Sequence, residues 1–250
     1  MPTNKAGRVC VVIGGAGGIG SAACISLAEA GHKVVIVDFN AERARTVAED
    51  IAGKGFDVNF DACDATRHED VEALRERVEA RHGPADILVN LAGVVRNDIL
   101  VKVKDEDFAL TMSTHVNGTL NSMRAFLPGM RKRGYGRVVN TSSTAARGTF
   151  GGASYATAKG AIEAMSRTAA FEMAKFGVTV NCVAPGLIRA GIFLTVPQEY
   201  QDKSIQSIPM GRAGEAKEVG GVIRFLASDD ASYVTGQTLY CCGGLTIGPI

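Results

Sequence analysis

The amino-acid sequence predicts an α/β protein of one domain, in which helices cover both faces of a parallel sheet of about seven strands. Short runs of β-branched residues alternate with longer segments of helical periodicity, which is the pattern of a doubly wound parallel sheet. A length of 250 residues suits a single domain over 1–250. A glycine-rich turn directly after the first predicted strand indicates the same architecture.

The predicted elements follow one another in regular order. Seven runs have the composition of strands: residues 8–13, 33–38, 57–61, 87–90, 136–141, 179–183 and 237–240. Apolar residues at helical spacing predict helices that end at Gly31 and near Gly83, and further helices over 41–52, 105–133, 153–176 and 215–227. Residues 187–207 show no convincing core period, and we expect a mobile substrate lid there.

Composition excludes several functional classes. The 27 basic residues nearly balance the 26 acidic ones, so no strong field exists to hold nucleic acid or an anionic membrane. No apolar run is long enough to span a bilayer or to form the core of a signal peptide, which predicts a cytoplasmic protein. The six cysteines lack metal-ligand spacing, so we expect reduced thiols and no metal site.

The first predicted strand leads directly into Gly14-Gly15-Ala16-Gly17-Gly18-Ile19-Gly20 and then into a helix. Glycine in such a turn lets the backbone approach a pyrophosphate, whose charge is stabilised by the helix N-terminus. Two spacings fit this run: GxGxxG at Gly15, Gly17 and Gly20, and GxxxGxG at Gly14, Gly18 and Gly20. The turn therefore predicts a Rossmann-like dinucleotide-binding site.

Asp38 ends the second predicted strand, at the place where an acidic side chain accepts hydrogen bonds from the adenosine ribose. Its carboxylate would repel a 2′-phosphate, and Arg43 is the nearest cation that could compensate, so we expect NAD rather than NADP. Asp38 could instead cap the following helix. Asp64, which precedes another predicted helix, has the same two interpretations.

Tyr155 and Lys159 lie four residues apart at the start of a predicted helix, so their side chains share one face. A phenol with its ordinary pKa of about 10 is a poor base at neutral pH. Lowering this pKa by roughly three units takes about 4 kcal/mol, which a nearby ammonium together with a nicotinamide cation can supply. Tyr155 can then accept the proton of an alcohol, although such pairs are also common on helix surfaces.

Six motifs extend along the chain: Gly14-x-x-x-Gly18-x-Gly20, Asn90-Leu91-Ala92-Gly93, Gly136-Arg137-Val138-Val139-Asn140-Thr141-Ser142-Ser143, Tyr155-x-x-x-Lys159, Asn181-Cys182-Val183-Ala184-Pro185-Gly186 and Phe225-Leu226-Ala227-Ser228 with Thr235-Gly236. In order and spacing they resemble the short-chain dehydrogenase/reductase family, over essentially the whole chain. The branch they resemble contains NAD-dependent alcohol dehydrogenases and 3-oxoacyl reductases.

The resemblance implies that Tyr155 is the acid/base, that Lys159 binds the nicotinamide ribose and tunes the tyrosine, and that a serine holds the substrate oxygen. Counting forward from Gly136 selects Ser143, whereas the usual interval back from the tyrosine selects Ser142. We favour Ser143, because a gap is easier to place in a loop than in a buried strand. The implied cofactor-binding residues are Gly14, Gly15, Gly18, Ile19, Gly20, Asp38, Asp64, Asn90, Ala92, Gly93, Tyr155, Lys159, Pro185, Gly186 and Ile188.

Three positions depart from the family pattern. His115 stands where the family usually has an asparagine that, with a water, links the lysine to solvent, so we include it among the catalytic candidates. An imidazole there could titrate, or it could simply pack against the sheet. Leu91 replaces the second asparagine of Asn-Asn-Ala-Gly, and Ala190 stands where a threonine usually bonds the cofactor.

The main functional hypothesis is an NAD-dependent oxidoreductase that interconverts a secondary alcohol and its ketone. The apolar residues at 192–196 favour a bulky or cyclic substrate. One alternative is an NADPH-dependent 3-oxoacyl-thioester reductase, against which Asp38 argues, and another is a non-catalytic, cofactor-binding regulatory protein. The apolar helices from 105 and 153 resemble the faces through which this family forms tetramers, so we expect a homotetramer.

Overall fold

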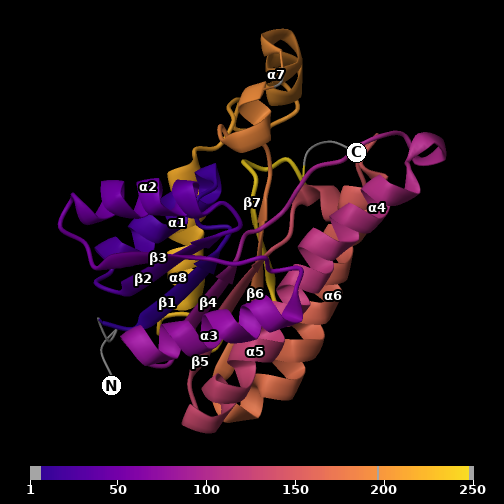
Figure 1. Cartoon of the computed structure of the whole chain (residues 1–250). Helices are drawn as coiled ribbons and strands as arrows, with labels where there is room; N and C mark the ends of the chain where they lie inside the picture. The colour runs from indigo at the N-terminus through magenta and orange to yellow at the C-terminus, as the bar shows by residue number, and fades with distance from the viewer. Residues whose placement is uncertain (1–6, 196, 248–250) are drawn as a thin grey trace.

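The computed structural model describes residues 7–195 and 197–247, and within them it contains a parallel sheet of seven strands (Figure 1). The strand order is β3-β2-β1-β4-β5-β6-β7. The strands are β1 (Val9–Ile13), β2 (Lys33–Asp38), β3 (Val58–Ala62), β4 (Ile87–Asn90), β5 (Gly136–Thr141), β6 (Val178–Pro185) and β7 (Thr238–Cys241). The predicted single-domain, Rossmann-like sheet is confirmed.

Helices cover both faces of the sheet and create two cores. One core contains α1 (Gly18–Glu29), α2 (Ala41–Ala52) and α8 (Ala216–Ala227), and the other contains α3 (His68–His82), α5 (Gly118–Arg133) and α6 (Ala153–Met173) (Figure 1). Successive side chains of a strand point to opposite faces. Accordingly, Val11 of β1 enters the core under α3, α5 and α6, whereas Val12 enters the core under α1, α2 and α8.

The predicted helix over 105–133 is interrupted. It consists of α4 (Asp105–Met112), a π-helical turn at Ser113–Asn117, and α5. The N–H of Gly118 donates to the carbonyls of both Ser113 and His115. A π turn inserts one residue into the helical register, and apolar periodicity gives no sign of it. His115 is the buried residue of this turn.

The strand order reverses between β1 and β4, because β2 and β3 lie on one side of β1 and the later strands lie on the other. In open α/β sheets the crevice at the carboxyl ends of the strands, next to this reversal, is where ligands bind. Ile13, Asn90, Thr141 and Pro185 end four neighbouring strands at that edge. The fold thus brings motifs from four distant segments of the chain to one place.

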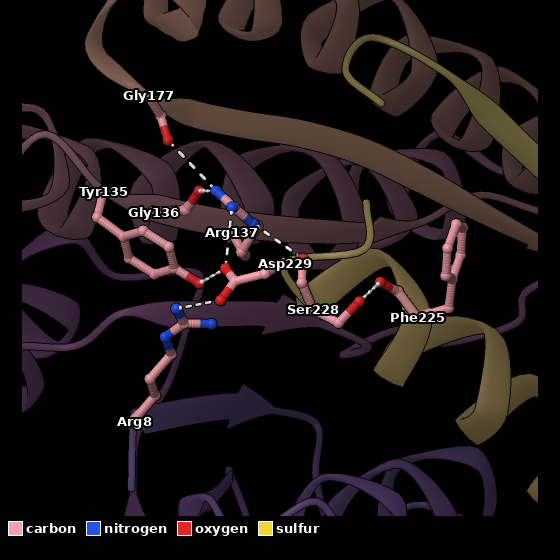
Figure 2. A network of polar contacts seen from close by, with 8 residues as sticks. All are labelled: Arg8, Tyr135, Gly136, Arg137, Gly177, Phe225, Ser228 and Asp229. Carbon is pink, nitrogen blue, oxygen red and sulfur yellow. Dashed lines mark hydrogen bonds and ion pairs between the residues drawn. The ribbon is translucent and has the colours of Figure 1, made fainter. Parts of the chain in front are cut away.

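A network of charged side chains lies at the opposite edge, where the strands begin (Figure 2). Asp229 accepts hydrogen bonds from Nη2 of Arg8 at 2.8 Å and from Nη2 of Arg137 at 3.3 Å. Both guanidinium groups pack on the ring of Tyr135, at 4.2 and 4.5 Å from its centroid. Arg137 also donates to the carbonyl of Ser228. These contacts fasten the segment after α8 to the start of β1 and β5.

Burial raises the pKa of the Asp229 carboxyl, but the hydrogen bond from Arg8 and the charges of Arg8 and Arg137 outweigh it and hold the pKa below its ordinary value. A carboxyl whose pKa is depressed in the folded state stabilises the fold above the pH at which it titrates in the unfolded chain. This contribution is lost as the pH falls through the folded-state pKa.

The described residues can be searched for disulfides, metal sites and membrane-spanning helices, none of which the sequence predicts. All six cysteines are free thiols. Residues 7–195 and 197–247 contain no group of three or more side chains that could hold a metal ion. Within the same ranges, no helix combines the length and the apolar character needed to cross a membrane.

Asp229→Asn is expected to lower the midpoint of thermal unfolding by about 4–8 °C at pH 7. The reason is that two largely buried guanidinium groups lose their anion, at a cost of about 2 kcal/mol where the site is partly open to water. Asp230→Asn, at the exposed neighbouring position, is the control and should change the midpoint by about 1 °C or less. Equal midpoints for the two variants at pH 7 would show that the network contributes no stability.

Candidate active site

A continuous cleft follows the carboxyl edge of the sheet. A cavity of about 340 Å³ lies next to β5 and α6, and a second one of about 520 Å³ lies next to β2. Both are lined by Gly14, Gly17, Leu91, Gly93 and Val94. Because these five residues border both spaces, the cavities form the two ends of one elongated site, which is the shape that a dinucleotide requires.

The glycine-rich turn lies where the two cavities meet. Gly14 has a φ of +79°, and a Cβ there would overlap the backbone of Ala92. A Cβ on Gly20 would overlap the carbonyl of Gly14, and one on Gly18 would lie 2.9 Å from Cβ of Ala190. A Cβ on Gly17 would have no neighbour closer than 3.4 Å. All three positions of the GxxxGxG spacing therefore exclude a side chain.

The start of α1 offers backbone donors to the same space. Its N-cap, Gly17, supplies no side-chain hydrogen bond, and Gly18, Ile19 and Gly20 line the cleft. The uncapped N–H groups and the positive end of the helix dipole form an anion site. This cradle of glycines and free N–H groups fits the pyrophosphate of a dinucleotide.

Asp38 lines the second cavity and does not cap α2. Its Oδ1 accepts a hydrogen bond from the N–H of Asn40 at 3.1 Å, whereas the side chain of Asn40 caps α2 by accepting from the N–H of Arg43. The capping alternative considered for Asp38 is therefore wrong. Asp64 lines the same cavity and accepts from both the N–H and the hydroxyl of Thr66, which orders the turn before α3.

Arg43 also reaches this cavity. Its Nη2 donates to the carbonyl of Ala16 at 3.1 Å, so the guanidinium lies across the glycine-rich turn, near Asp38. The cavity beside β2 thus contains one carboxylate that would repel a 2′-phosphate and one cation that would attract it.

Asn90, Ala92 and Gly93 do not share one role. Ala92 and Gly93 line the cleft, but Asn90 lies behind it, with its amide donating to Oδ1 of Asn140 at 2.8 Å. Asn140 in turn donates to Oγ of Ser166 at 2.8 Å. The Asn90 side chain therefore ties β4 to β5 and α6, and does not reach the cavity surface expected for a cofactor ligand.

Tyr155 and Lys159 extend from the first turns of α6 into the first cavity. Lys159 is buried, and its Nζ donates to the carbonyl of Thr141 at 2.7 Å. The same Nζ is 5.5 Å from the centre of the Tyr155 ring. Burial lowers the pKa of Lys159 to about 8.

In the protein without a cofactor, the pKa of Tyr155 is raised. Burial raises it, and a hydrogen bond from Ser143 acts in the opposite direction without cancelling the effect of burial. The ammonium of Lys159 is directed to the Thr141 carbonyl and lies beside the ring of Tyr155. The phenolate was expected from the ammonium together with a nicotinamide cation, so its formation with the cofactor bound stays a prediction.

The two serines at the end of β5 point to different partners. Ser142 is buried and donates to Oε1 of Glu163 at 2.7 Å. Ser143 lines the cleft with Tyr155, whose pKa it lowers, and accepts from the N–H of Ala145 at 3.2 Å. Both residues border the cavity, but the Ser142 hydroxyl is buried and occupied by Glu163, so the Ser143 hydroxyl is the better candidate to meet a substrate.

Sequence reasoning missed Glu163, although a signal was present. Tyr155, Lys159, Glu163 and Arg167 recur at intervals of four, so all four lie on one face of α6. Glu163 is largely buried, and Arg167 lies 3.8 Å from its carboxylate. The hydrogen bond from Ser142 to Glu163 ties the segment just before Ser143 to α6.

His115 lines the first cavity and is 2 % exposed. Its ring packs edge-to-face with the ring of Tyr155, with 5.4 Å between centroids. Burial and the charge of Lys159 lower the pKa of His115 to about 4. The structure therefore places a neutral imidazole next to Tyr155.

Residues that follow β6 close the far end of this cavity. Pro185, Gly186 and Ile188 line it, and Phe193 from the 3-10 helix Gly191–Thr195 faces them. Helix α7 (Gln198–Ile205) projects beyond the sheet (Figure 1). Val196 and the side chain of Ile192, which contributed to the expectation of a bulky substrate, lie outside the described part of the structure.

Known proteins share both this fold and these motifs. The family model described as Enoyl-(Acyl carrier protein) reductase matches residues 14–246. The 3-oxoacyl-[acyl-carrier-protein] reductase FabG of Thermotoga maritima is 35% identical over 242 residues, which covers 96% of this chain and 98% of that protein. The chain belongs to the short-chain dehydrogenase/reductase family. It is therefore an oxidoreductase of a family that binds a nicotinamide cofactor.

Two further relatives show the range of the family. The (2S)-[(R)-hydroxy(phenyl)methyl]succinyl-CoA dehydrogenase subunit BbsD of Thauera aromatica is 35% identical over 240 residues, which covers 96% of this chain and 97% of that one. A gluconate 5-dehydrogenase from Burkholderia cenocepacia, solved in complex with NADP and tartrate, has a TM-score of 0.94 and is 33% identical. That match covers 98% of this chain and 97% of the other.

Ser143→Ala is expected to lower kcat/KM about 100-fold or more, because the hydroxyl that faces the cleft is lost, while NADH affinity stays within about threefold. Ser142→Ala serves as the comparison and should retain much more activity, since its hydroxyl is buried and donates to Glu163, although the residue also borders the cavity. Steady-state kinetics and fluorescence titration with NADH measure both effects. A larger loss of kcat/KM in Ser142→Ala than in Ser143→Ala would reverse the assignment.

Proposed function

We propose that this protein interconverts 3-hydroxyacyl and 3-oxoacyl thioesters with NAD(H), and that Tyr155 transfers the proton. The observation that carries the proposal is that Ser143, Tyr155 and Lys159 all line one cleft, in which Ser143 lowers the pKa of Tyr155. A substrate oxygen near both hydroxyls would meet a hydrogen-bond donor and a proton acceptor at once.

The relatives support the thioester part of the proposal. The FabG relative is named for a 3-oxoacyl group on a carrier protein, and the BbsD relative is named for a hydroxylated acyl-CoA. Both names favour the thioester alternative over a free bulky or cyclic alcohol. Apolar residues line the substrate end of the cleft, namely Val94, Val95, Leu187 and Phe193, and such a lining suits an acyl chain.

In the direction of oxidation, the hydroxyl of Ser143 donates to the substrate oxygen and orients the alcohol. The phenolate oxygen of Tyr155 accepts the alcohol proton as the substrate carbon becomes a carbonyl. An oxidised nicotinamide, held by the glycine-rich turn and Lys159, would supply the hydride acceptor and a positive charge that favours the phenolate. In reduction, Tyr155 returns the proton to the alkoxide.

Lys159 holds this arrangement in place. Its ammonium is fixed by the Thr141 carbonyl and lies beside the Tyr155 ring, one helical turn along α6. The pKa of about 8 leaves a protonated fraction large enough to donate to the hydroxyls of a ribose near neutral pH. The role we propose for Lys159 is to orient the cofactor and to favour the charged form of the phenol when the cofactor is present.

We propose NAD(H) as the cofactor because Asp38 has no helix to cap and lines the cavity. Its carboxylate is available to accept hydrogen bonds from the adenosine ribose and would repel a 2′-phosphate. Arg43 is the feature that favours NADP, and the gluconate 5-dehydrogenase structure contains NADP. The competition between Asp38 and Arg43 decides the preference.

Two structural expectations remain part of the proposal. We propose the lid over 187–207 because, among its described residues, Phe193 lines the cleft while α7 projects away from the sheet. A second copy of the chain covers the outer faces of α5 and α6, since a groove of about 780 Å³ between them is lined by apolar side chains that include Leu120, Leu127, Met165 and Met173. Such pairing agrees with the expected homotetramer.

The purified protein is expected to reduce acetoacetyl-CoA and to oxidise 3-hydroxybutyryl-CoA at least tenfold more efficiently than it converts gluconate or a cyclic secondary alcohol. Absorbance at 340 nm, with each nicotinamide cofactor in turn, measures this. Tyr155→Phe should lower kcat by about 1000-fold or more with little change in NADH affinity. NADH binding without turnover of any substrate would favour the regulatory alternative, and full activity of Tyr155→Phe would refute the role of Tyr155.

Asp38→Asn is expected to shift the ratio of kcat/KM for NAD over NADP toward NADP by about tenfold or more, because a charge that repels the 2′-phosphate is removed. Asp50→Asn, on an exposed part of α2, is the matched control and should leave the ratio unchanged. A wild-type preference for NADPH that Asp38→Asn does not alter would show that Arg43 dominates the site.

A further inference from the structure

His115 occupies a site that the proposed reaction does not yet explain. It is almost completely buried in the π-helical turn between α4 and α5, and yet it lines the cavity that contains Tyr155 and Lys159. Since the π turn breaks a helix that would otherwise run continuously, the fold places this side chain at the cleft by a specific local distortion. His115 is therefore placed to act on Tyr155 and Lys159.

Nε2 of His115 contacts the backbone of Val94. It lies 2.7 Å from the carbonyl oxygen, and it is 3.1 Å from the backbone nitrogen, whose N–H is directed at it as a donor. In a neutral imidazole each ring nitrogen is either a donor or an acceptor. Nε2 cannot both accept from the Val94 N–H and donate to the Val94 carbonyl, and the 2.7 Å contact would be repulsive between two acceptors, so we assign the proton to Nε2, which donates to the carbonyl. Nδ1 is then an acceptor, and it is buried without a hydrogen-bond partner in the described part of the structure.

The ring of His115 packs between the Tyr155 ring and the backbone at Gly93. On one side it packs edge-to-face against Tyr155, with an interplanar angle of 81°. On the other side it fills the space next to Gly93, where a Cβ would overlap the imidazole. Gly93 and Val94 lie in the segment after β4, Tyr155 lies on α6, and His115 contacts both segments. Movement of this ring would therefore displace the catalytic phenol.

The surroundings keep this imidazole uncharged. Lys159 on α6 is the charged group that faces it, and Tyr155 on the same helix is the other titratable neighbour. From the segment after β4 it meets the backbone of Val94 and no carboxylate. A cation nearby and burial both disfavour a second proton on the ring.

We propose that His115 is a positioning residue, which remains neutral at working pH, carries its proton on Nε2, and holds the Tyr155 ring and the Val94 peptide in place. It does not relay protons between Lys159 and solvent. This inference rests on the proposed role of Tyr155 for its catalytic consequence, but not for the state of the imidazole itself. The asparagine that the family usually has at this position is thus replaced by a group with a packing and hydrogen-bonding role.

The state of the imidazole can be measured without turnover. Histidine labelled with ¹⁵N in the wild-type chain, with the His115 signals assigned by comparison with His115→Asn, reports the tautomer and the charge of the ring through its nitrogen shifts. The expected result is a neutral Nε2–H tautomer from pH 8 down to about pH 5, whereas exposed imidazoles titrate near 6.5. Protonation of His115 near pH 6, or an Nδ1–H tautomer, would overturn the proposal whatever the substrate is.

The positioning role is tested by two substitutions and a control. His115→Phe keeps a ring against Tyr155 but removes the donor to Val94, and it should lower kcat about tenfold or more. The midpoint of the acid limb of the kcat/KM profile for oxidation should also move, by about half a pH unit or more, because that limb reports ionisation of the phenol. His115→Asn restores a donor and should recover part of the loss. His68→Asn, at an exposed position on α3, should change neither.

Two kinetic outcomes would refute the positioning role of His115. A wild-type acid limb with a midpoint between 6 and 7 that disappears in both His115 variants would establish a titrating relay and refute the proposal. Unchanged kcat and pH profile in both variants would also refute it, since the ring would then be only part of the packing. Thermal unfolding of each variant separates these effects from loss of the fold. If the proposed substrate is wrong, the nitrogen shifts still test the state of His115.

Discussion

The hydrogen bond from the ammonium of Lys159 to the carbonyl of Thr141 is the contact on which the chemical end of the molecule depends. A buried ammonium is costly unless it has a partner, and here the partner is the last residue of β5. The bond therefore fixes the first turns of α6 against the end of the strand that carries Ser143. Tyr155, one turn before Lys159, acquires its position from the same anchor.

The parallel sheet separates this chemistry from a second polar region. At the carboxyl edge lie the glycine-rich turn, Asp38 and the catalytic candidates, and at the amino edge Asp229 joins Arg8 to Arg137 (Figure 2). Every strand runs the same way, so residues at the starts of strands cannot reach the cleft. The charges at the amino edge hold the sheet and α8 together, whereas those at the carboxyl edge remain available for a ligand.

Most of the fold followed from local patterns, because buried parallel strands and amphipathic helices each leave a distinct period in the sequence. The site could be predicted where one residue type satisfies a steric rule, as at Gly14, or where spacing sets a helix face, as at Tyr155 and Lys159. Other features depend on contacts between distant segments. Periodicity could not reveal the π turn at His115, the hydrogen bond from Asn90 to Asn140, or the burial that raises the pKa of Tyr155.

The tight fit between Gly93 and His115 means that a substitution at one position depends on the residue at the other. With an imidazole at 115, any side chain at 93 would collide with the ring, so substitutions at 93 are blocked for as long as the histidine stays. A smaller residue at 115 would have to arise first. The contact thus imposes an order on mutation, a form of epistasis in which one departure from the family pattern constrains how its neighbour can evolve.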